Sequence, residues 1–204
     1  MRRMTIVVCV GCGCVVIYLL AGLLGPSVHA GVFMVQAVRP VGTVAVSKLV
    51  KQFPQGLRVL GVPTVSAAFI NQVLAVYHSP ARGTGQALYS LGVQYGIDPV
   101  IALAFFMHES SFGTQGEARF SKSLGNLRCL VGALCRDGYA WFSAWQAGYQ
   151  AWYTLIRQVY VEQWGCVTVE QIIPHYAPSA DGNDETAYIA AVEQAVQVWR
   201  SGRV

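Results

Sequence analysis

One carboxylate in this sequence, Glu109, lies in surroundings that favour acid–base chemistry. It follows Val100 to Met107, which is apolar on every face and is therefore typical of a helix surrounded by protein. Asp98 can cap the free amides at the start of this helix, and Pro99 suits its first position. Ser110, Ser111 and Gly113 are expected to end it, with Gly113 as a left-handed stop. The sequence thus predicts a buried helix that carries Glu109 in its last turn.

This position predicts a raised pKa for Glu109, because apolar surroundings and the negative end of a helix dipole both disfavour an ionised carboxylate. A carboxyl group that is protonated near neutral pH can donate a proton to a glycosidic oxygen as the sugar leaves. From spacing alone, a solvated glutamate at a helix end is an equally good interpretation.

The run ALAFFMHESSFG, followed by SLGNLRC, resembles a known family of cell-wall hydrolases. This is the bacterial N-acetylglucosaminidase family, mannosyl-glycoprotein endo-β-N-acetylglucosaminidase-like, glycoside hydrolase family 73; goose-type lysozymes and lytic transglycosylases are looser matches. The resemblance implies that Glu109 is the catalytic acid and that Gly125 and Asn126 line the sugar subsites. The later segment YAPSADGNDETAYIAAV is similar to the family's closing loop and last helix, with Tyr176 as the loop tyrosine. The resemblance also implies a lysozyme-like fold.

A second catalytic carboxylate is not evident in the sequence. Glycosidases usually pair two carboxylates, one of which activates water or attacks the sugar. By loop position Asp137 is the best candidate, and Glu117, Asp181 and Asp184 are others. In the family the acetamido group of the substrate can take the nucleophile's place, and a lytic transglycosylase works with one glutamate. Glu109 alone is therefore compatible with hydrolysis and with transglycosylation.

The stretch from Gly116 to Tyr139 is expected to form a loop or small hairpin lobe that supplies the polar side of a cleft. Its basic residues have no acid between them; they are Arg119, Lys122, Arg128 and Arg136. If they line the cleft, they would attract the carboxylates of peptidoglycan; a solvated basic loop is an equal alternative. We take Tyr139 and Tyr176 as substrate-binding candidates, because aromatic rings can stack on sugar faces. Arg128 is a third candidate because of its positive charge. Trp141 is expected in the core.

Helical periodicity predicts a mostly α domain around this lobe. The expected helices are Ser66 to Tyr77, Gly83 to Tyr95, the Glu109 helix, Phe142 to Val161, a short helix with a capping box at Thr168 to Gln171, and a last helix from Asn183 or Asp184 to about Arg200. The aromatic stripe of the fourth helix is expected to be core.

The N-terminus predicts export. Two arginines precede Thr5 to Leu24, which carries no charge, and Val28-x-Ala30 fits signal peptidase. We expect residues 1–30 to be a signal peptide or membrane anchor, 31–65 a linker and 66–204 the folded domain outside the cytoplasm. The formal charge of +4 among 204 residues is too small to indicate nucleic-acid binding.

Cysteine usage agrees with an exported protein. Cys9, Cys12 and Cys14 lie in the hydrophobic segment, and CVGCGC is weak as a lipidation signal. Of the three pairings open to the remaining cysteines, we favour Cys129 with Cys135, which are closest in sequence, and expect a buried thiol at Cys166. No histidine lies at zinc-ligand spacing from these thiols, and no metal or cofactor is suggested.

The function expected from these features is peptidoglycan hydrolysis at N-acetylglucosamine by a monomer, with Glu109 as general acid. A lytic transglycosylase that cuts after N-acetylmuramic acid is the nearest alternative. A non-catalytic peptidoglycan-binding domain is the alternative of a different class. The expected partners are glycan strands and, if the N-terminal segment is not cleaved, the membrane.

Overall fold

The computed structural model describes residues 6–9, 14–17 and 55–204 of a chain that divides into two units, Met1–Ala45 and Val46–Val204. In the first unit, strands β1 (Ile6–Cys9) and β2 (Cys14–Ile17) pair in antiparallel register. The rest of the expected signal or anchor, and the expected linker up to residue 54, lie outside the described residues. Among the residues described, no helix is both long and apolar enough to cross a membrane.

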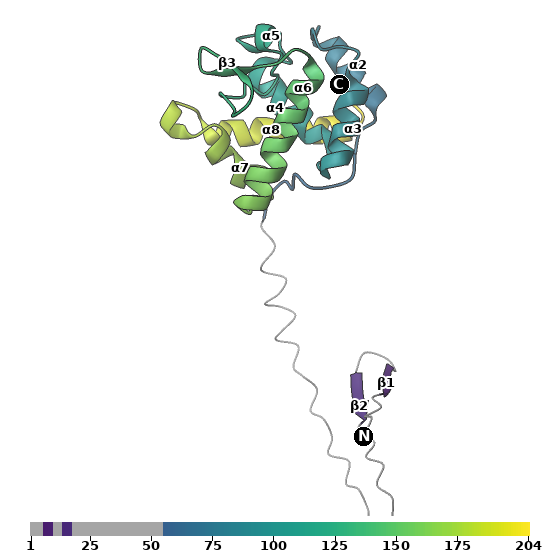
Figure 1. The fold of residues 1–204 in the computed structure, drawn as a ribbon. Helices are drawn as coiled ribbons and strands as arrows, with labels where there is room; N and C mark the ends of the chain where they lie inside the picture. Colours follow the sequence, from purple (N-terminus) through teal and green to yellow (C-terminus); the bar gives the residue numbers. More distant parts are fainter. Residues whose placement is uncertain (1–5, 10–13, 18–54) are drawn as a thin grey trace, which may run out of the picture. The chain divides into compact units, whose positions relative to one another are not determined.

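Residues 55–204 form a mostly helical domain, as predicted (Figure 1). Its helices are α2 (Ala67–Val76), α3 (Gly85–Tyr95), α4 (Pro99–Ser110), α5 (Ala118–Ser121), α6 (Trp145–Thr154), the π-helix η1 (Leu155–Gln163), α7 (Val169–Tyr176), the 3-10 turn η2 (Ser179–Asp181) and α8 (Glu185–Arg200). Strands β3 (Leu134–Arg136) and β4 (Tyr139–Trp141) form a hairpin that begins in the stretch predicted as a hairpin lobe and runs two residues past its predicted end at Tyr139. The four-residue helix α5 also lies in that stretch and is not predicted.

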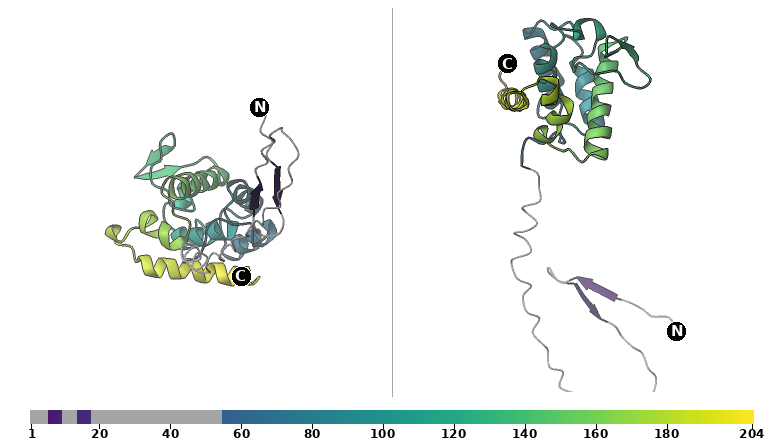
Figure 2. Two further views of the ribbon diagram at one scale, coloured as in Figure 1. Left: turned by 90° about the horizontal axis from the view of Figure 1, so that it is seen from below. Right: turned by 90° about the vertical axis from the view of Figure 1, so that its left-hand side faces the viewer.

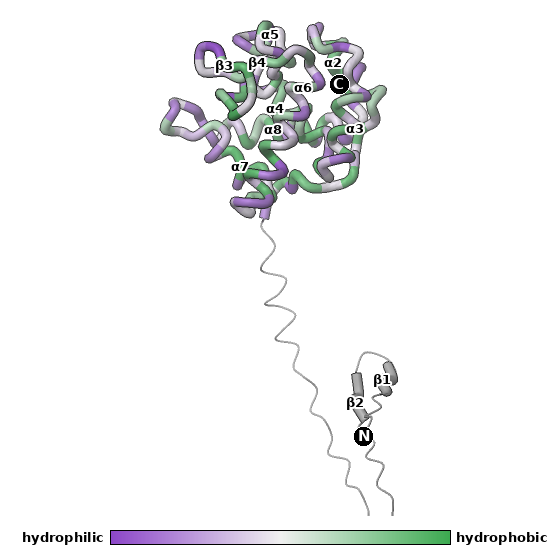
Figure 3. Tube along the Cα trace, in the orientation of Figure 1, coloured by the Kyte–Doolittle hydropathy of each residue, from purple (hydrophilic) through white to green (hydrophobic). Residues whose placement is uncertain are grey.

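Helix α4 is the central element of the core. Every residue from Pro99 to Phe106 is buried, and the helix packs mainly against α8 and α3. The tube in Figure 3 shows this apolar segment inside the domain, whereas polar residues gather at the tips of the hairpin and of the loop before α8. The all-round apolar pattern therefore identifies a buried helix, as the sequence predicts.

Helix α4 ends at Ser110, within the predicted stretch, and Gly113 is left-handed as expected, with φ of 78°. Ser111, not Gly113, is the first left-handed residue after the helix, with φ of 45°, and Phe112 follows with φ of 56°. The amide of Ser111 donates to Met107 O at 3.0 Å, and that of Phe112 donates to Phe106 O at 3.0 Å. These two hydrogen bonds and the full burial of Phe112 hold non-glycine residues in a conformation that glycine usually adopts.

Asp98 ties the start of α4 to the end of α8. Its carboxylate is buried and accepts hydrogen bonds from Val100 N at 3.3 Å and from Thr64 Oγ1 at 2.6 Å. Arg200 Nη2, at the end of α8, donates to the same carboxylate at 2.9 Å. Asp98 is therefore the predicted helix cap and also a tertiary link.

We expect Asp98→Ala to lower the free energy of unfolding by about 2–4 kcal/mol, because it removes a helix cap and charge-assisted hydrogen bonds. Urea denaturation measures this change. Arg203→Ala, which removes an exposed side chain bonded to Ser201, is the control. A loss below about 1 kcal/mol for Asp98→Ala would show that the link contributes little.

The segment from Leu57 to Val65, assigned to the linker by sequence, packs on the domain. Val59 is fully buried, and its amide donates to Val167 O at 3.1 Å. Leu60 forms an isolated bridge with Ile97, next to the start of α4. The folded domain thus begins earlier than residue 66, because this segment packs beside the starts of α4 and α7.

The fourth predicted helix is α6 continued by η1. It begins at Trp145 rather than Phe142, and its second half has π geometry. The predicted aromatic stripe is core, since Tyr149 and Trp152 are buried. At the start of α7, Gln171 Oε1 accepts from Thr168 N at 3.2 Å, which is the glutamine half of the predicted capping box, and the predicted Asp184 cap of α8 accepts from Ala187 N at 2.9 Å.

The predicted disulfide joins Cys129 to Cys135 across a Cα separation of 5.2 Å. Cys166 is buried and has no disulfide partner among the described residues. The hairpin and the loop that contains η2 project on the same side of the domain (Figure 2, left). These two projections contribute walls to a cavity beside α4.

Candidate active site

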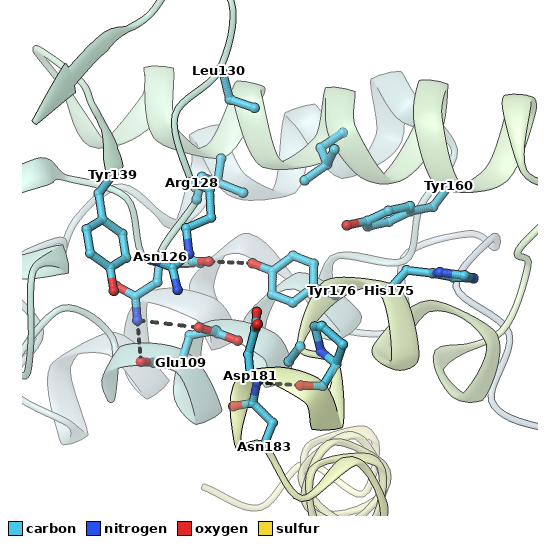
Figure 4. A pocket seen from close by; sticks show the side chains of 15 residues that line it. Glu109, Asn126, Arg128, Leu130, Tyr139, Tyr160, His175, Tyr176, Asp181 and Asn183 are labelled. Atoms are coloured by element: carbon cyan, nitrogen blue, oxygen red, sulfur yellow. Dashed lines mark hydrogen bonds between the residues drawn. The ribbon is translucent and has the colours of Figure 1, made fainter. Parts of the chain in front are cut away.

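A cavity of about 450 Å³ lies beside the C-terminal end of α4. The loop after α5, strand β4, η1, the end of α7 and η2 form its walls. Its lining residues are Glu109, Gly125, Asn126, Leu127, Arg128, Leu130, Tyr139, Leu155, Tyr160, His175, Tyr176, Ala177, Pro178, Asp181 and Asn183 (Figure 4). The structure thus brings together six of the predicted site residues: Glu109, Gly125, Asn126, Arg128, Tyr139 and Tyr176.

The Glu109 carboxylate is half-buried and held by two side chains. The Tyr188 hydroxyl donates to Oε1 at 2.6 Å, and Asn126 Nδ2 lies 3.4 Å from Oε2. Asn126 Nδ2 also donates to the main-chain oxygen of Glu109 at 2.6 Å. The ring of His108 stacks on Tyr188 with 3.7 Å between centroids, which restricts the plane of the phenol. Glu109 therefore has a fixed direction at the cavity wall.

Burial raises the pKa of Glu109 above its usual range. The hydrogen bonds from Tyr188 and Asn126 and the positive charge of Arg128 act in the opposite direction, since each favours the ionised form. Burial is the largest of these effects, so the pKa is raised, in the direction that the sequence predicts. This glutamate can hold a proton in a cavity open to a ligand.

The loop from Ser123 to Leu127 is tied to the end of α4. Ser110 Oγ donates to Leu124 O at 2.8 Å and accepts from Gly113 N at 2.9 Å. Asn126 is left-handed, with φ of 47°, and its side-chain amide reaches Glu109 from this loop. The serine that follows the glutamate thus fixes the loop that carries Asn126.

Gly125 allows a close approach of two aromatic side chains. The Tyr176 hydroxyl donates to Gly125 O, and Tyr176 packs edge-on against Phe105. A Cβ atom at position 125 would lie 2.6 Å from Trp152 Cδ1 and 2.7 Å from the Tyr176 hydroxyl oxygen. The main role of Tyr176 in this structure is therefore to position the loop.

Gly125→Ala is expected to destabilise the domain by about 1–3 kcal/mol, because the added methyl group overlaps Trp152 and Tyr176. Thermal or urea unfolding measures this loss. Gly61→Ala is the matched control, since the nearest atom to a Cβ there is 4.0 Å away. Equal stability of the two variants would contradict the close packing of the loop.

Arg128 is the one member of the predicted basic group that lines the cavity. Its guanidinium lies over the Tyr139 ring, 4.8 Å from the centroid. Lys122 Nζ donates to Ser143 O at 2.6 Å, and the Arg136 guanidinium lies 4.7 Å from the Trp141 ring centroid. Of the four predicted basic residues, a ligand in the cavity therefore meets only Arg128, whose guanidinium is held against an aromatic ring.

The structure does not bring Asp137 to this cavity. Asp137 is exposed at the turn of the β3–β4 hairpin, with φ of 50°. Of the other carboxylates considered, Asp181 lines the cavity from η2, whereas Glu117 precedes α5 and Asp184 caps α8. Asp181 is thus the second carboxylate that shares the cavity with Glu109.

Sequence reasoning did not identify Tyr188 and missed Tyr160, His175 and Asn183 in the wall. A signal for Tyr188 exists, because it falls on the buried stripe of α8 and a buried tyrosine hydroxyl usually needs a partner. That signal does not say which partner, since Glu109 is 79 residues away in the chain.

Among the residues described, no group of three or more His, Cys, Asp or Glu side chains is placed to hold a metal ion. No protein-family model matches the chain, and no curated protein matches it closely enough to count as a relative. The resemblance to cell-wall glucosaminidases therefore stays a prediction from the motifs around Glu109.

Proposed function

We propose that this protein cleaves the glycan strand of peptidoglycan at N-acetylglucosamine, with Glu109 as the general acid. The single observation that carries the proposal is the Glu109 carboxyl group, which is half-buried at a cavity wall and has a raised pKa. In the reaction Glu109 gives its proton to the glycosidic oxygen, the C–O bond breaks and the leaving sugar departs as an alcohol. Water completes the hydrolysis at the anomeric carbon.

The cavity supports a carbohydrate substrate. Its volume of about 450 Å³ suits a ligand of a few small rings, and its walls include the hairpin and η2. Tyr139 lines the cavity with its ring held against Arg128, and Arg128 offers a positive charge to the lactyl or peptide carboxylates of the wall polymer. These residues bind and orient, and Glu109 supplies the proton.

Asp181 is the carboxylate that we assign to the second step, because it lines the same cavity from the loop that contains η2. As a base it would take a proton from the attacking water. If instead the acetamido group of the substrate attacks, Asp181→Asn should retain most of the activity.

Lytic transglycosylation is a second candidate, favoured by one observation. Of the two carboxylates that line the cavity, Glu109 is held by side-chain hydrogen bonds, whereas Asp181 is exposed on η2. A single positioned glutamate can act as acid and then as base, so that a hydroxyl of the substrate attacks in place of water.

The experiment that tests the proposal is digestion of purified peptidoglycan by the full chain, followed by measurement of the soluble glycan fragments released. We expect release that depends on Glu109. A folded protein that binds peptidoglycan and releases no fragment would be a binding module instead, and the catalytic assignment would fail.

A further inference from the structure

Three rings form a cluster at one end of the cavity. Tyr160 and His175 line the cavity, and Trp164 contacts both of them. The Trp164 centroid lies 5.1 Å from that of Tyr160 and 5.2 Å from that of His175. In Figure 4, Tyr160 and His175 lie beyond Tyr176 as seen from Glu109. We call Tyr160, Trp164 and His175 the distal cluster.

The distal cluster is built by an unusual backbone. Tyr160 belongs to the π-helix η1, and π geometry is rare and often found at functional sites. The chain turns directly after it, because Trp164 N donates to Val159 O at 3.0 Å and Cys166 N donates to Tyr160 O at 2.8 Å. This turn leaves Trp164 54% exposed, whereas Tyr160 is only 6% exposed and packs behind it, so Trp164 and His175 are the members of the cluster that a ligand can reach.

We propose that the distal cluster is a carbohydrate subsite that stacks a sugar ring of the glycan strand at a distance from the bond held at Glu109. This subsite rests on the proposed function. A pyranose ring presents a face of C–H bonds, which packs well on the electron-rich face of an aromatic ring. His175 adds ring nitrogens that can hydrogen-bond a sugar hydroxyl or acetamido group.

The aromatic residues that line the cavity beyond Glu109 favour a glycan strand as the occupant. Tyr176 lies 6.3 Å from Tyr160 between ring centroids, and Tyr160, His175 and Tyr176 line the same cavity as Glu109. Trp164 packs against Tyr160 and His175 at the edge of this lining. A glycan is a linear polymer of rings. If one of its bonds lies at Glu109, rings further along the strand must leave the cavity at one of its ends, and this end is lined by aromatic side chains.

The test measures binding of β-1,4-linked N-acetylglucosamine oligomers of increasing length by calorimetry. The full chain carries Glu109→Gln throughout, so that binding is measured without turnover. Adding Trp164→Ala should weaken the affinity for the longer oligomers about tenfold and leave that for the disaccharide unchanged. Trp164→Phe should keep most of the affinity for the longer oligomers that Trp164→Ala loses. Phe120→Ala, which removes an aromatic residue 60% exposed outside the cavity, is the matched control and should have no effect.

The outcomes separate this inference from the proposed function. If Trp164→Ala weakens short and long oligomers equally, or neither, the distal subsite is wrong while glycan cleavage at Glu109 can still be correct. If no oligomer binds and peptidoglycan is not cleaved, both proposals fail. Circular dichroism of each variant shows whether the fold is kept. Should Trp164→Ala not fold, His175→Ala, which removes the other exposed ring of the distal cluster, keeps the test decisive: it should weaken only the longer oligomers, and an unchanged affinity would overturn the subsite.

Discussion

Glu109→Gln is expected to reduce peptidoglycan cleavage by about 10²–10⁴-fold, because glutamine has nearly the same shape but no acidic proton to donate. The fold should be unaffected, since the Tyr188 hydroxyl can still donate to the amide oxygen at the position of Oε1. Fragment release from peptidoglycan measures the loss, and urea unfolding should show a change within about 1 kcal/mol.

Asp137→Asn is the matched control for Glu109→Gln, because it makes the same chemical change outside the cavity. Asparagine tolerates the left-handed backbone at position 137, so the hairpin turn should be kept. The control variant should cleave at the rate of the unmodified chain. If Asp137→Asn were as inactive as Glu109→Gln, the assignment of catalysis to the cavity carboxylates would be wrong.

Tyr188→Phe is expected to lower kcat about 10- to 100-fold and to extend activity to higher pH. The loss of rate follows because the hydroxyl that fixes Glu109 at 2.6 Å is removed and the carboxyl can turn from its productive direction. The pH effect has a definite sign. The Tyr188 hydroxyl favours the ionised form and so lowers the pKa of Glu109; without it this pKa rises further.

A general acid must be protonated to act, so activity falls as the pH rises through its pKa. The alkaline limb of the pH–rate profile should therefore lie at higher pH in Tyr188→Phe than in the unmodified chain. Tyr149→Phe removes another buried hydroxyl, which bonds to Thr84 at 2.8 Å, and serves as control. A shift of the limb to lower pH, or the same shift in both variants, would contradict the role assigned to Tyr188.

Local signals predicted the helix of Glu109 well. Asp98 and Pro99 fix its start, and an apolar run without a polar face fixes its burial, so no knowledge of other elements is needed. Its end at Ser110 was also predicted, but the left-handed backbone angles of Ser111 and Phe112 were not, because only tertiary packing maintains them.

The proximity of Glu109 and Asn126 was anticipated by motif, whereas the partner Tyr188 was not. That contact needs α8 to pack on α4, which no local pattern specifies. The carboxylates illustrate the same limit. Asp137 and Asp181 are both in loops, and only the direction of the hairpin and of η2 decides that Asp181 reaches the cavity. The distal cluster depends on π geometry in η1, which the helical period of the sequence does not distinguish from α.

Whether Glu109 is the acid of a glucosaminidase is decided by the chemistry of the product ends. Peptidoglycan is digested with the full chain, and the fragments are analysed by mass before and after borohydride reduction. We expect N-acetylglucosamine ends that are reducible and that are absent from digests with Glu109→Gln. Anhydromuramic ends, which borohydride does not reduce, would contradict this assignment and identify a lytic transglycosylase.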